Sequence, residues 1–211
     1  MVERYLTSPA RCWFQGVHHL GVRSKLFTGD AQFRNFVIVR ALLLVSALST
    51  AFIILLHDDL SGIYGFVLAS GLASLVGGRV SGIFSDRSSK NTMAAGAAIS
   101  SVIILLIVAS SHWAPDSVNA WVMPLGFFAV NLAHTAVRVA RKTYVVDMAG
   151  GDKRTQYVGA ANTMMGIILL IMGGISSVIA LAGPEAALIF LALVGFIGVW
   201  RAGSLKEVSR T

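Results

Sequence analysis

A polar turn between two long apolar stretches carries the residues of this chain that are best suited to specific polar contacts. Gly78 and Gly82 lead into the turn, Asp86 and Arg87 lie in it, and Lys90 follows three residues later. A carboxylate beside an arginine or a helix N-terminus gains from charge-assisted hydrogen bonds and from attraction to the helix dipole. We therefore expect the turn to form a charge cluster with other helix ends.

Partners for these charges occur later in the chain. Arg138, Arg141 and Lys142 are available to the acid of the turn. Asp147 is available to its arginine. A solvated loop, whose charges act only as a topology signal, stays open as the alternative.

Polar side chains inside apolar stretches form a second candidate site, because such groups are costly in a membrane and are often functional. Asn131 and His134 lie deep in the fourth stretch, and Asn162 lies in the early part of the fifth. For the histidine, a structural hydrogen bond between helices and a role in proton coupling both stay open. Arg40 and Arg79 lie nearer the ends, and we expect their side chains to reach the inner interface.

Enzymatic and channel functions are disfavoured by what the apolar stretches lack. They contain neither an H-E-x-x-H nor a G-x-S-x-G run, and no carboxylate lies at a mid-membrane position. No catalytic residue, metal site or cofactor is therefore expected. No ring-forming filter motif of a channel is evident either.

The elements that position these residues are predicted to be transmembrane helices. Of the 211 residues 55% are hydrophobic and only 13% are charged, against about a quarter in soluble proteins. Crossing a bilayer takes roughly 20 helical residues, and six stretches reach about that length. The sequence thus predicts an all-α polytopic membrane protein with one six-helix domain over 36–201, built from spans at 36–56, 61–84, 92–110, 119–139, 157–182 and 184–201.

Two polar segments flank this domain. Residues 1–35 read as a cytoplasmic linker or as a basic amphipathic segment on the membrane surface, and 202–211 read as a cytoplasmic tail. Lys and Arg occur in the connections on one side of the predicted spans and in the tail, whereas the opposite connections have none. By the positive-inside rule both termini are cytoplasmic, and we expect a multi-pass protein of the cell membrane. The net charge of +7 follows from this bias, so a nucleic-acid partner is not expected.

The second span has two faces of small residues at helical spacing, which allow a neighbouring helix to approach closely. Sliding during a conformational cycle and static packing stay open, and both predict that Gly78→Leu or Gly82→Leu is damaging. One face contains Ser70, Ser74, Gly78 and Gly82, and the other contains Gly65, Ala69, Ala73 and Gly77.

The polar turn resembles the loop signature of the major facilitator superfamily, G-x-L-A-D-R-x-G-R-R/K. Gly82, Asp86 and Arg87 match it directly, and Lys90 stands for an arginine. Ser89 replaces the motif's glycine, which predicts a less sharp turn. The six spans resemble the C-terminal half of such a transporter. The resemblance implies that the acid and the arginine latch cytoplasmic helix ends in the outward-open state. It also implies that the first, fourth and fifth helices line the central cavity, which makes Asn131, His134 and Asn162 the predicted lining of a substrate cavity.

The family's mechanism uses two six-helix bundles that rock about a central site, and one bundle supplies half a cavity. We therefore expect half of a permease that moves a small solute together with a second six-helix half or a second copy. A non-transporting interaction protein or an inactive permease fragment is the alternative. The sequence does not identify the substrate or the coupling ion.

Overall fold

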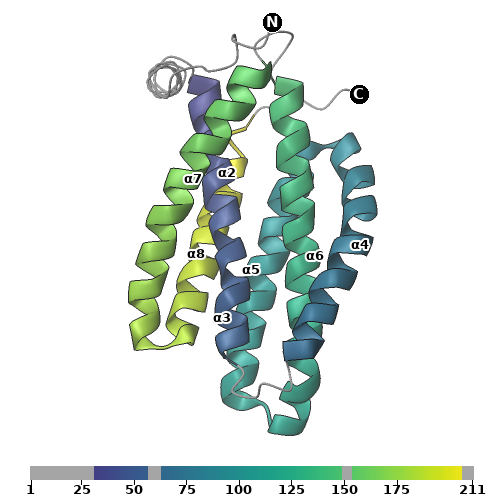
Figure 1. The fold of residues 1–211 in the computed structure, drawn as a ribbon, viewed down its shortest axis with the longest axis vertical. Helices are drawn as coiled ribbons and strands as arrows, with labels where there is room; N and C mark the ends of the chain where they lie inside the picture. The colour runs from purple at the N-terminus through teal and green to yellow at the C-terminus, as the bar shows by residue number, and fades with distance from the viewer. Residues whose placement is uncertain (1–30, 57–62, 149–153, 206–211) are drawn as a thin grey trace, which may run out of the picture.

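The computed structural model describes residues 31–56, 63–148 and 154–205, and these form a bundle of helices with no strand among them. Six helices are long and apolar enough to cross a membrane, which confirms the predicted all-α polytopic class. Figure 1 shows them side by side along the long axis. The elements are α2 (Ala31–Val45), η1 (Ser46–Leu48), α3 (Ser49–Leu55), α4 (Ile63–Arg87), α5 (Ser89–Trp113), α6 (Asp116–Met148), α7 (Arg154–Ile179), η4 (Ala180–Ala182) and α8 (Pro184–Ala202).

Most helices extend beyond the predicted apolar spans at one or both ends. The first begins at Ala31 rather than 36, and the fourth runs on to Met148 through a charged segment. Hydropathy ends a span where polar residues begin, whereas a helix continues as long as its backbone hydrogen bonds do. The amphipathic alternative for the N-terminal segment falls on residues 1–30, outside the described part of the chain, as does most of the predicted tail.

The first span consists of three elements that together cover Phe33–Leu55. A 3₁₀ turn interrupts it at η1, where the hydroxyl of Ser46 donates to the Leu43 carbonyl at 2.9 Å. Thr50 donates in the same way to Ala47 at 3.1 Å. Serine and threonine that bond back to the preceding turn tend to bend a helix, which accounts for the break at this place.

The long helix α6 contacts α4 along one side and α5 along another, and α8 packs between α5 and α2. Phe66 of α4 meets Phe127 of α6 edge to face at 4.8 Å. Glycines allow close approach elsewhere: a Cβ on Gly96 of α5 would lie 3.0 Å from the Ala133 carbonyl oxygen of α6. Helices α4 and α7 lie at opposite sides of the bundle (Figure 1), and α7 is the least buried of the six spans.

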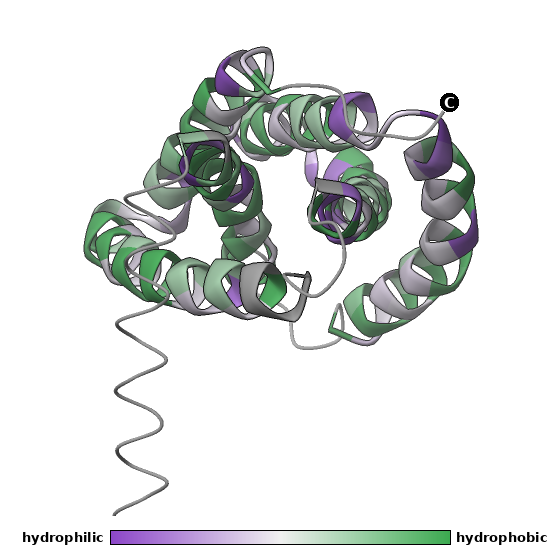
Figure 2. Cartoon of the chain, turned by 90° about the horizontal axis from the view of Figure 1, so that it is seen from above, coloured by the Kyte–Doolittle hydropathy of each residue, from purple (hydrophilic) through white to green (hydrophobic). Residues whose placement is uncertain are grey.

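The outer faces of the bundle are apolar, as a lipid environment requires. Large side chains such as Leu75, Leu106 and Leu170 are more than half exposed. Viewed along the bundle in Figure 2, hydrophobic residues occupy helix faces that point outward as well as inward. Exposed apolar surface of this extent is rare on soluble monomers, so the bundle has the surface of a membrane domain.

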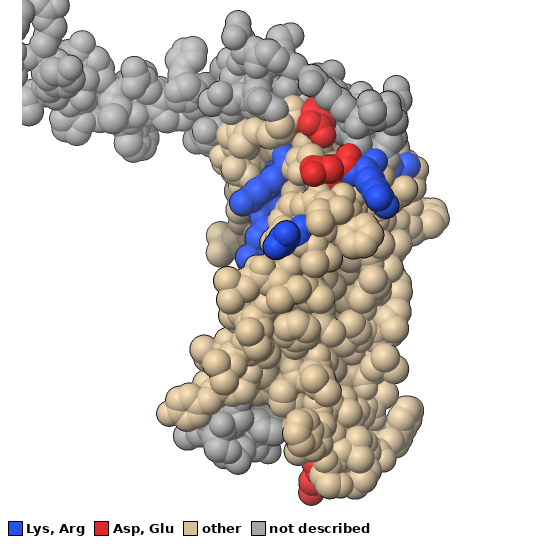
Figure 3. Space-filling model, turned by 90° about the vertical axis from the view of Figure 1, so that its right-hand side faces the viewer, with Lys and Arg blue, Asp and Glu red and all other residues tan. Residues whose placement is uncertain are grey.

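Charge divides the bundle into two ends. The start of α2 and the chain after α8 lie together, since the Asn35 amide nitrogen donates to the Ser204 hydroxyl at 3.0 Å. Figure 3 shows basic side chains clustered near this end and a broad uncharged zone beyond them. At the opposite end, His112 of α5 and Glu185 of α8 form an ion pair at 2.8 Å. The positive-inside rule assigns the end that bears Asn35 and Ser204 to the cytoplasm.

Candidate functional site

The polar turn is sharper than its sequence predicts. Helix α4 continues to Arg87 and α5 begins at Ser89, so Ser88 alone is non-helical. Its backbone is extended (φ −159°), and its hydroxyl accepts the Asn91 N–H at 3.2 Å. Serine is a favoured N-cap because it satisfies a free N–H of the first turn. The prediction that Ser89 would loosen the turn is therefore wrong, since the adjacent N-cap makes a glycine unnecessary.

Asp86 and Arg87 occupy the last turn of α4 and are exposed. Within the described residues, no ion pair joins either of them to Arg138, Arg141 or Asp147. The structure thus does not bring the expected charge cluster together inside this bundle. Both charges remain available to groups outside it.

Lys90 has a role that the sequence did not reveal. Its ammonium donates to the carbonyl oxygens of Gly203 at 3.2 Å and Leu205 at 2.7 Å, just beyond the end of α8. Carbonyls at a helix C-terminus lack partners within the helix, and a lysine there also suits the helix dipole. This residue of the motif therefore ties the α4–α5 turn to the last helix.

The two small-residue faces of α4 have different environments. Ala69, Ala73 and Gly77 are buried, and a Cβ on Gly77 would lie 3.1 Å from Leu132 and Thr135 of α6. Around Gly78 and Gly82, in contrast, no described atom beyond the adjacent residues and the backbone of α4 itself lies within 4 Å of the place that a Cβ would take. Close approach of another helix at these two glycines therefore stays a prediction.

A polar site joins α2, α6 and α7 at their cytoplasmic thirds. The Arg40 Nη2 of α2 donates to the Asn162 side-chain oxygen of α7 at 2.7 Å, and its guanidinium lies 5.8 Å from the Phe36 ring centre. Arg40 is only 4% exposed. The prediction that it extends to the inner interface is wrong, because it turns inward to a partner on another helix. Arg79, by contrast, is exposed.

Helix α6 contributes one face to this site. Asn131, His134, Arg138 and Arg141 follow each other at intervals of three and four residues, which places them on one side of a helix. The Arg141 Nη1 reaches the Met165 sulfur of α7 at 3.4 Å, and Asn131 donates to the Phe127 carbonyl of its own helix at 2.9 Å. This polar face of α6 therefore meets α7 near its cytoplasmic end.

His134 is 2% exposed, yet neither ring nitrogen has a hydrogen-bond partner. The structure therefore does not contain the interhelical hydrogen bond that was one of the two expectations for this residue. Buried polar atoms are nearly always satisfied in native proteins. His134 is one of the exceptions among the described residues, together with Arg40 and Arg141.

An aromatic pair closes the site on the cytoplasmic side. Phe36 and Tyr144 stack with ring centres 4.9 Å apart and are fully buried. They lie about one helical turn toward the cytoplasm from Arg40 and Arg141, respectively. On the other hand, Arg138 and Asn162 are exposed, so the site opens sideways between α6 and α7.

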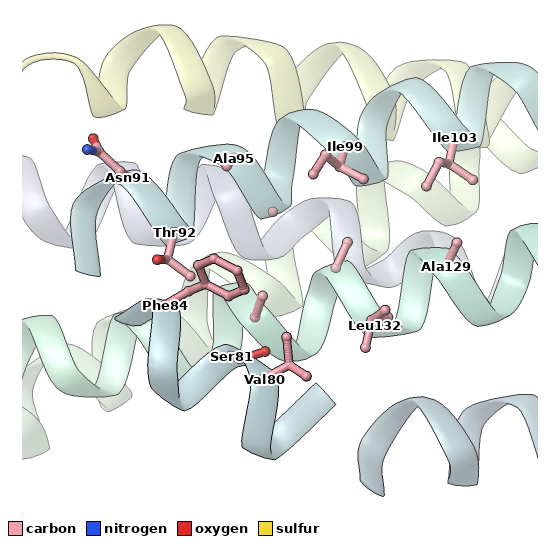
Figure 4. A pocket seen from close by; sticks show the side chains of 13 residues that line it. Val80, Ser81, Phe84, Asn91, Thr92, Ala95, Ile99, Ile103, Ala129 and Leu132 are labelled. Carbon is pink, nitrogen blue, oxygen red and sulfur yellow. The ribbon is translucent and has the colours of Figure 1, made fainter. Parts of the chain in front are cut away.

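A separate groove of about 470 Å³ lies between α4, α5 and α6. Its lining is almost wholly apolar, and Figure 4 shows Phe84, Ile99 and Leu132 around it, with Asn91 and Thr92 toward one end. None of the predicted cavity residues lines this groove. No cluster that could hold a metal ion occurs among the described residues.

The described residues form one bundle of six membrane-length helices. The start of the first helix and the end of the last one lie together at its basic end. These features define a polytopic helical membrane protein. The family model of the Major Facilitator Superfamily matches residues 35–209, so the chain belongs to this family of membrane transporters. The family that the polar turn predicted is thereby confirmed. Comparisons with curated proteins and with solved structures gave no match.

Proposed function

We propose that this chain is one six-helix half of a secondary transporter, which moves a small solute by alternating access together with a second six-helix bundle. The observation that carries the proposal is the open side of the bundle. Several glycines of the two flanking helices have no described atom beyond the adjacent residues and their own helix backbone within 4 Å of the place a Cβ would take. They are Gly65, Gly71, Gly78 and Gly82 on α4 and Gly166, Gly173 and Gly174 on α7.

Small residues in a membrane helix permit close helix–helix contact, which is a main source of association energy in lipid. Two such faces at opposite sides of one bundle suit a partner that contacts both. A two-fold arrangement would set α4 of one half beside α7 of the other. The polar face of α6 would then lie in the enclosed space between the halves.

The charges of the α4–α5 turn support the same arrangement. Asp86 and Arg87 are exposed and pair with none of the described residues. In the proposed transporter they form a cytoplasmic latch against the second half. The latch holds the inner side closed and favours the outward-open state.

Association through these faces is tested by the molar mass of the purified chain in detergent and by chemical cross-linking in its native membrane. Gly78→Leu and Gly166→Leu should abolish a complex of two six-helix units, because a leucine keeps the helices apart. Ala95→Leu, an exposed small-to-large change on α5, should leave the complex intact.

A complex that survives both glycine variants would contradict the proposed interface. A monomer in the native membrane that carries no solute flux would instead favour a non-transporting interaction protein.

A further inference from the structure

We infer that the polar site between α2, α6 and α7 binds an oxyanion, so that the transported solute carries a carboxylate, phosphate or sulfate group. This inference rests on the proposed function and names the substrate class of its site. It follows from the charge balance of the site, from its unused hydrogen-bond donors and from the direction in which it opens.

The site has cations without counter-charges. Arg40 and Arg141 lie within electrostatic range of one another across the meeting of α2 and α6, and Arg138 lies within range of Arg141. The described carboxylates lie near helix ends, and the one ion pair that any of them forms joins His112 to Glu185 at the opposite end of the bundle. Asn162, the hydrogen-bonding partner of Arg40, is neutral.

The guanidinium groups of Arg40 and Arg141 also have hydrogen-bond donors without an acceptor. In Arg40 the Nε and Nη1 atoms are buried without a partner, and in Arg141 the same holds for Nε. Burying a cation without compensation is expensive, more so at membrane depth. A guanidinium presents its N–H groups in a planar fork that matches the oxygens of carboxylate and phosphate. An oxyanion between the two arginines would supply both the missing charge and the missing acceptors.

The surroundings fit a solute that comes from the open side of the bundle. The stacked Phe36 and Tyr144 close the cytoplasmic side, whereas exposed Arg138 and Asn162 border the open face. Two turns along α6 from Arg141, the buried ring nitrogens of His134 also lack a hydrogen-bond partner. The apolar groove between α4, α5 and α6 has no comparable donors.

The same oxyanion chemistry could come from a lipid headgroup, so the test separates the two sources. The purified full chain is placed in nanodiscs of phosphatidylcholine alone, and its thermal unfolding is followed by tryptophan fluorescence. Potassium phosphate, sulfate and citrate are each titrated against potassium chloride at equal ionic strength. A second set of nanodiscs contains phosphatidylglycerol.

We expect at least one of the three oxyanions to raise Tm saturably in phosphatidylcholine, by roughly 5 °C at saturation. Arg40→Gln and Arg141→Gln should abolish this response. Arg79→Gln removes an exposed arginine of α4 and should keep the response. If Arg40→Gln does not fold, Arg40→Lys keeps the charge without the fork and should weaken anion affinity about tenfold.

A response to none of the three oxyanions would overturn the inference, as would an equal response in Arg40→Gln and the unmodified chain. Stabilisation by phosphatidylglycerol alone would assign the arginines to a lipid headgroup and overturn the solute assignment. Saturable oxyanion binding together with an absence of flux in a complex of two six-helix units would uphold the oxyanion site while contradicting the proposed function. Flux of a neutral solute without any oxyanion response would uphold the proposed function while contradicting the oxyanion site.

Discussion

Buried polar side chains with unused hydrogen-bonding atoms are the clearest functional signal at the residue scale. His134 has two such nitrogens, and Arg40 and Arg141 have three more between them. A purely structural polar residue in a membrane helix would be expected to bond to a neighbouring helix. All three residues lie on α2 and α6 with these atoms buried inside the bundle, and we propose that they belong to the solute site.

Replacing His134 with leucine should raise the thermal stability of the isolated chain while abolishing solute flux. The unsatisfied imidazole costs on the order of 1–3 kcal/mol in the folded state, and an apolar side chain removes that cost. Unfolding in detergent and flux in proteoliposomes containing the whole transporter measure the two effects.

His112→Leu is the matched control, because it removes a solvent-exposed imidazole whose ion pair with Glu185 contributes little. It should leave stability and flux nearly unchanged. Strong destabilisation by His134→Leu would show that the imidazole has a structural role.

Lys90→Met should loosen the end of the last helix. The variant loses the donor to the carbonyls of Gly203 and Leu205, which we expect to cost about 1–2 kcal/mol because one of the two bonds is exposed. Hydrogen exchange at the C-terminal turn of α8 should accelerate. Lys142→Met removes an exposed lysine of α6 and should leave this exchange rate unchanged. Equal exchange rates in the two variants would contradict the role of Lys90 in holding the end of α8.

The sequence indicated the identity of the site residues better than their partners. Asn131, His134 and Asn162 could be selected because polar groups in apolar stretches stand out, whereas the sequence suggested Arg141 only as a partner for Asp86. The partner of Asn162 could not be predicted, because Arg40 lies 122 residues away in the sequence. In addition, the short distance of Arg40 from the end of its helix suggested a position at the membrane interface. Such pairs depend on helix packing, which hydropathy and spacing do not determine.

At the scale of elements, α4 has one face that packs against its own bundle and one that packs against no other described helix. Ala69, Ala73 and Gly77 pack against α6, whereas Gly71, Gly78 and Gly82 contact nothing described. Both faces consist of small residues, so the sequence predicts close approach for each but cannot tell which contact is internal. Similarly, it located the six spans but not their ends, since Ser88 alone separates two helices that hydropathy separated by a longer turn.

Glycine substitutions should distinguish internal from external packing. In Gly96→Val the added side chain would meet the Ala133 carbonyl and Val137 at 3.0 Å, so α5 and α6 must separate. We expect a loss of about 2 kcal/mol in unfolding free energy. Gly78→Val has open space and should leave the isolated chain as stable as before, apart from the small cost of valine in a helix.

Reversible unfolding in mixed detergent measures the unfolding free energy of Gly96→Val and Gly78→Val. Equal destabilisation by the two variants would contradict the assignment of internal and external faces.

At the scale of the whole molecule, we propose that this bundle is half of an alternating-access transporter. Arg138 and Asn162 beside the polar site are exposed, and so are Asp86 and Arg87 at the end of α4. A single bundle with these features cannot enclose a solute, whereas two related by a two-fold axis can.

The most direct test is the accessibility of a cysteine at position 131, midway along α6 on its polar face, in the native membrane with Cys12 replaced by serine. We expect Asn131→Cys to react with a membrane-impermeant thiol reagent from both sides, and Asp86→Asn to increase reaction from the cytoplasm relative to the outside by breaking the latch. Reaction from one side only, or an unchanged ratio in Asp86→Asn, would contradict alternating access governed by this turn.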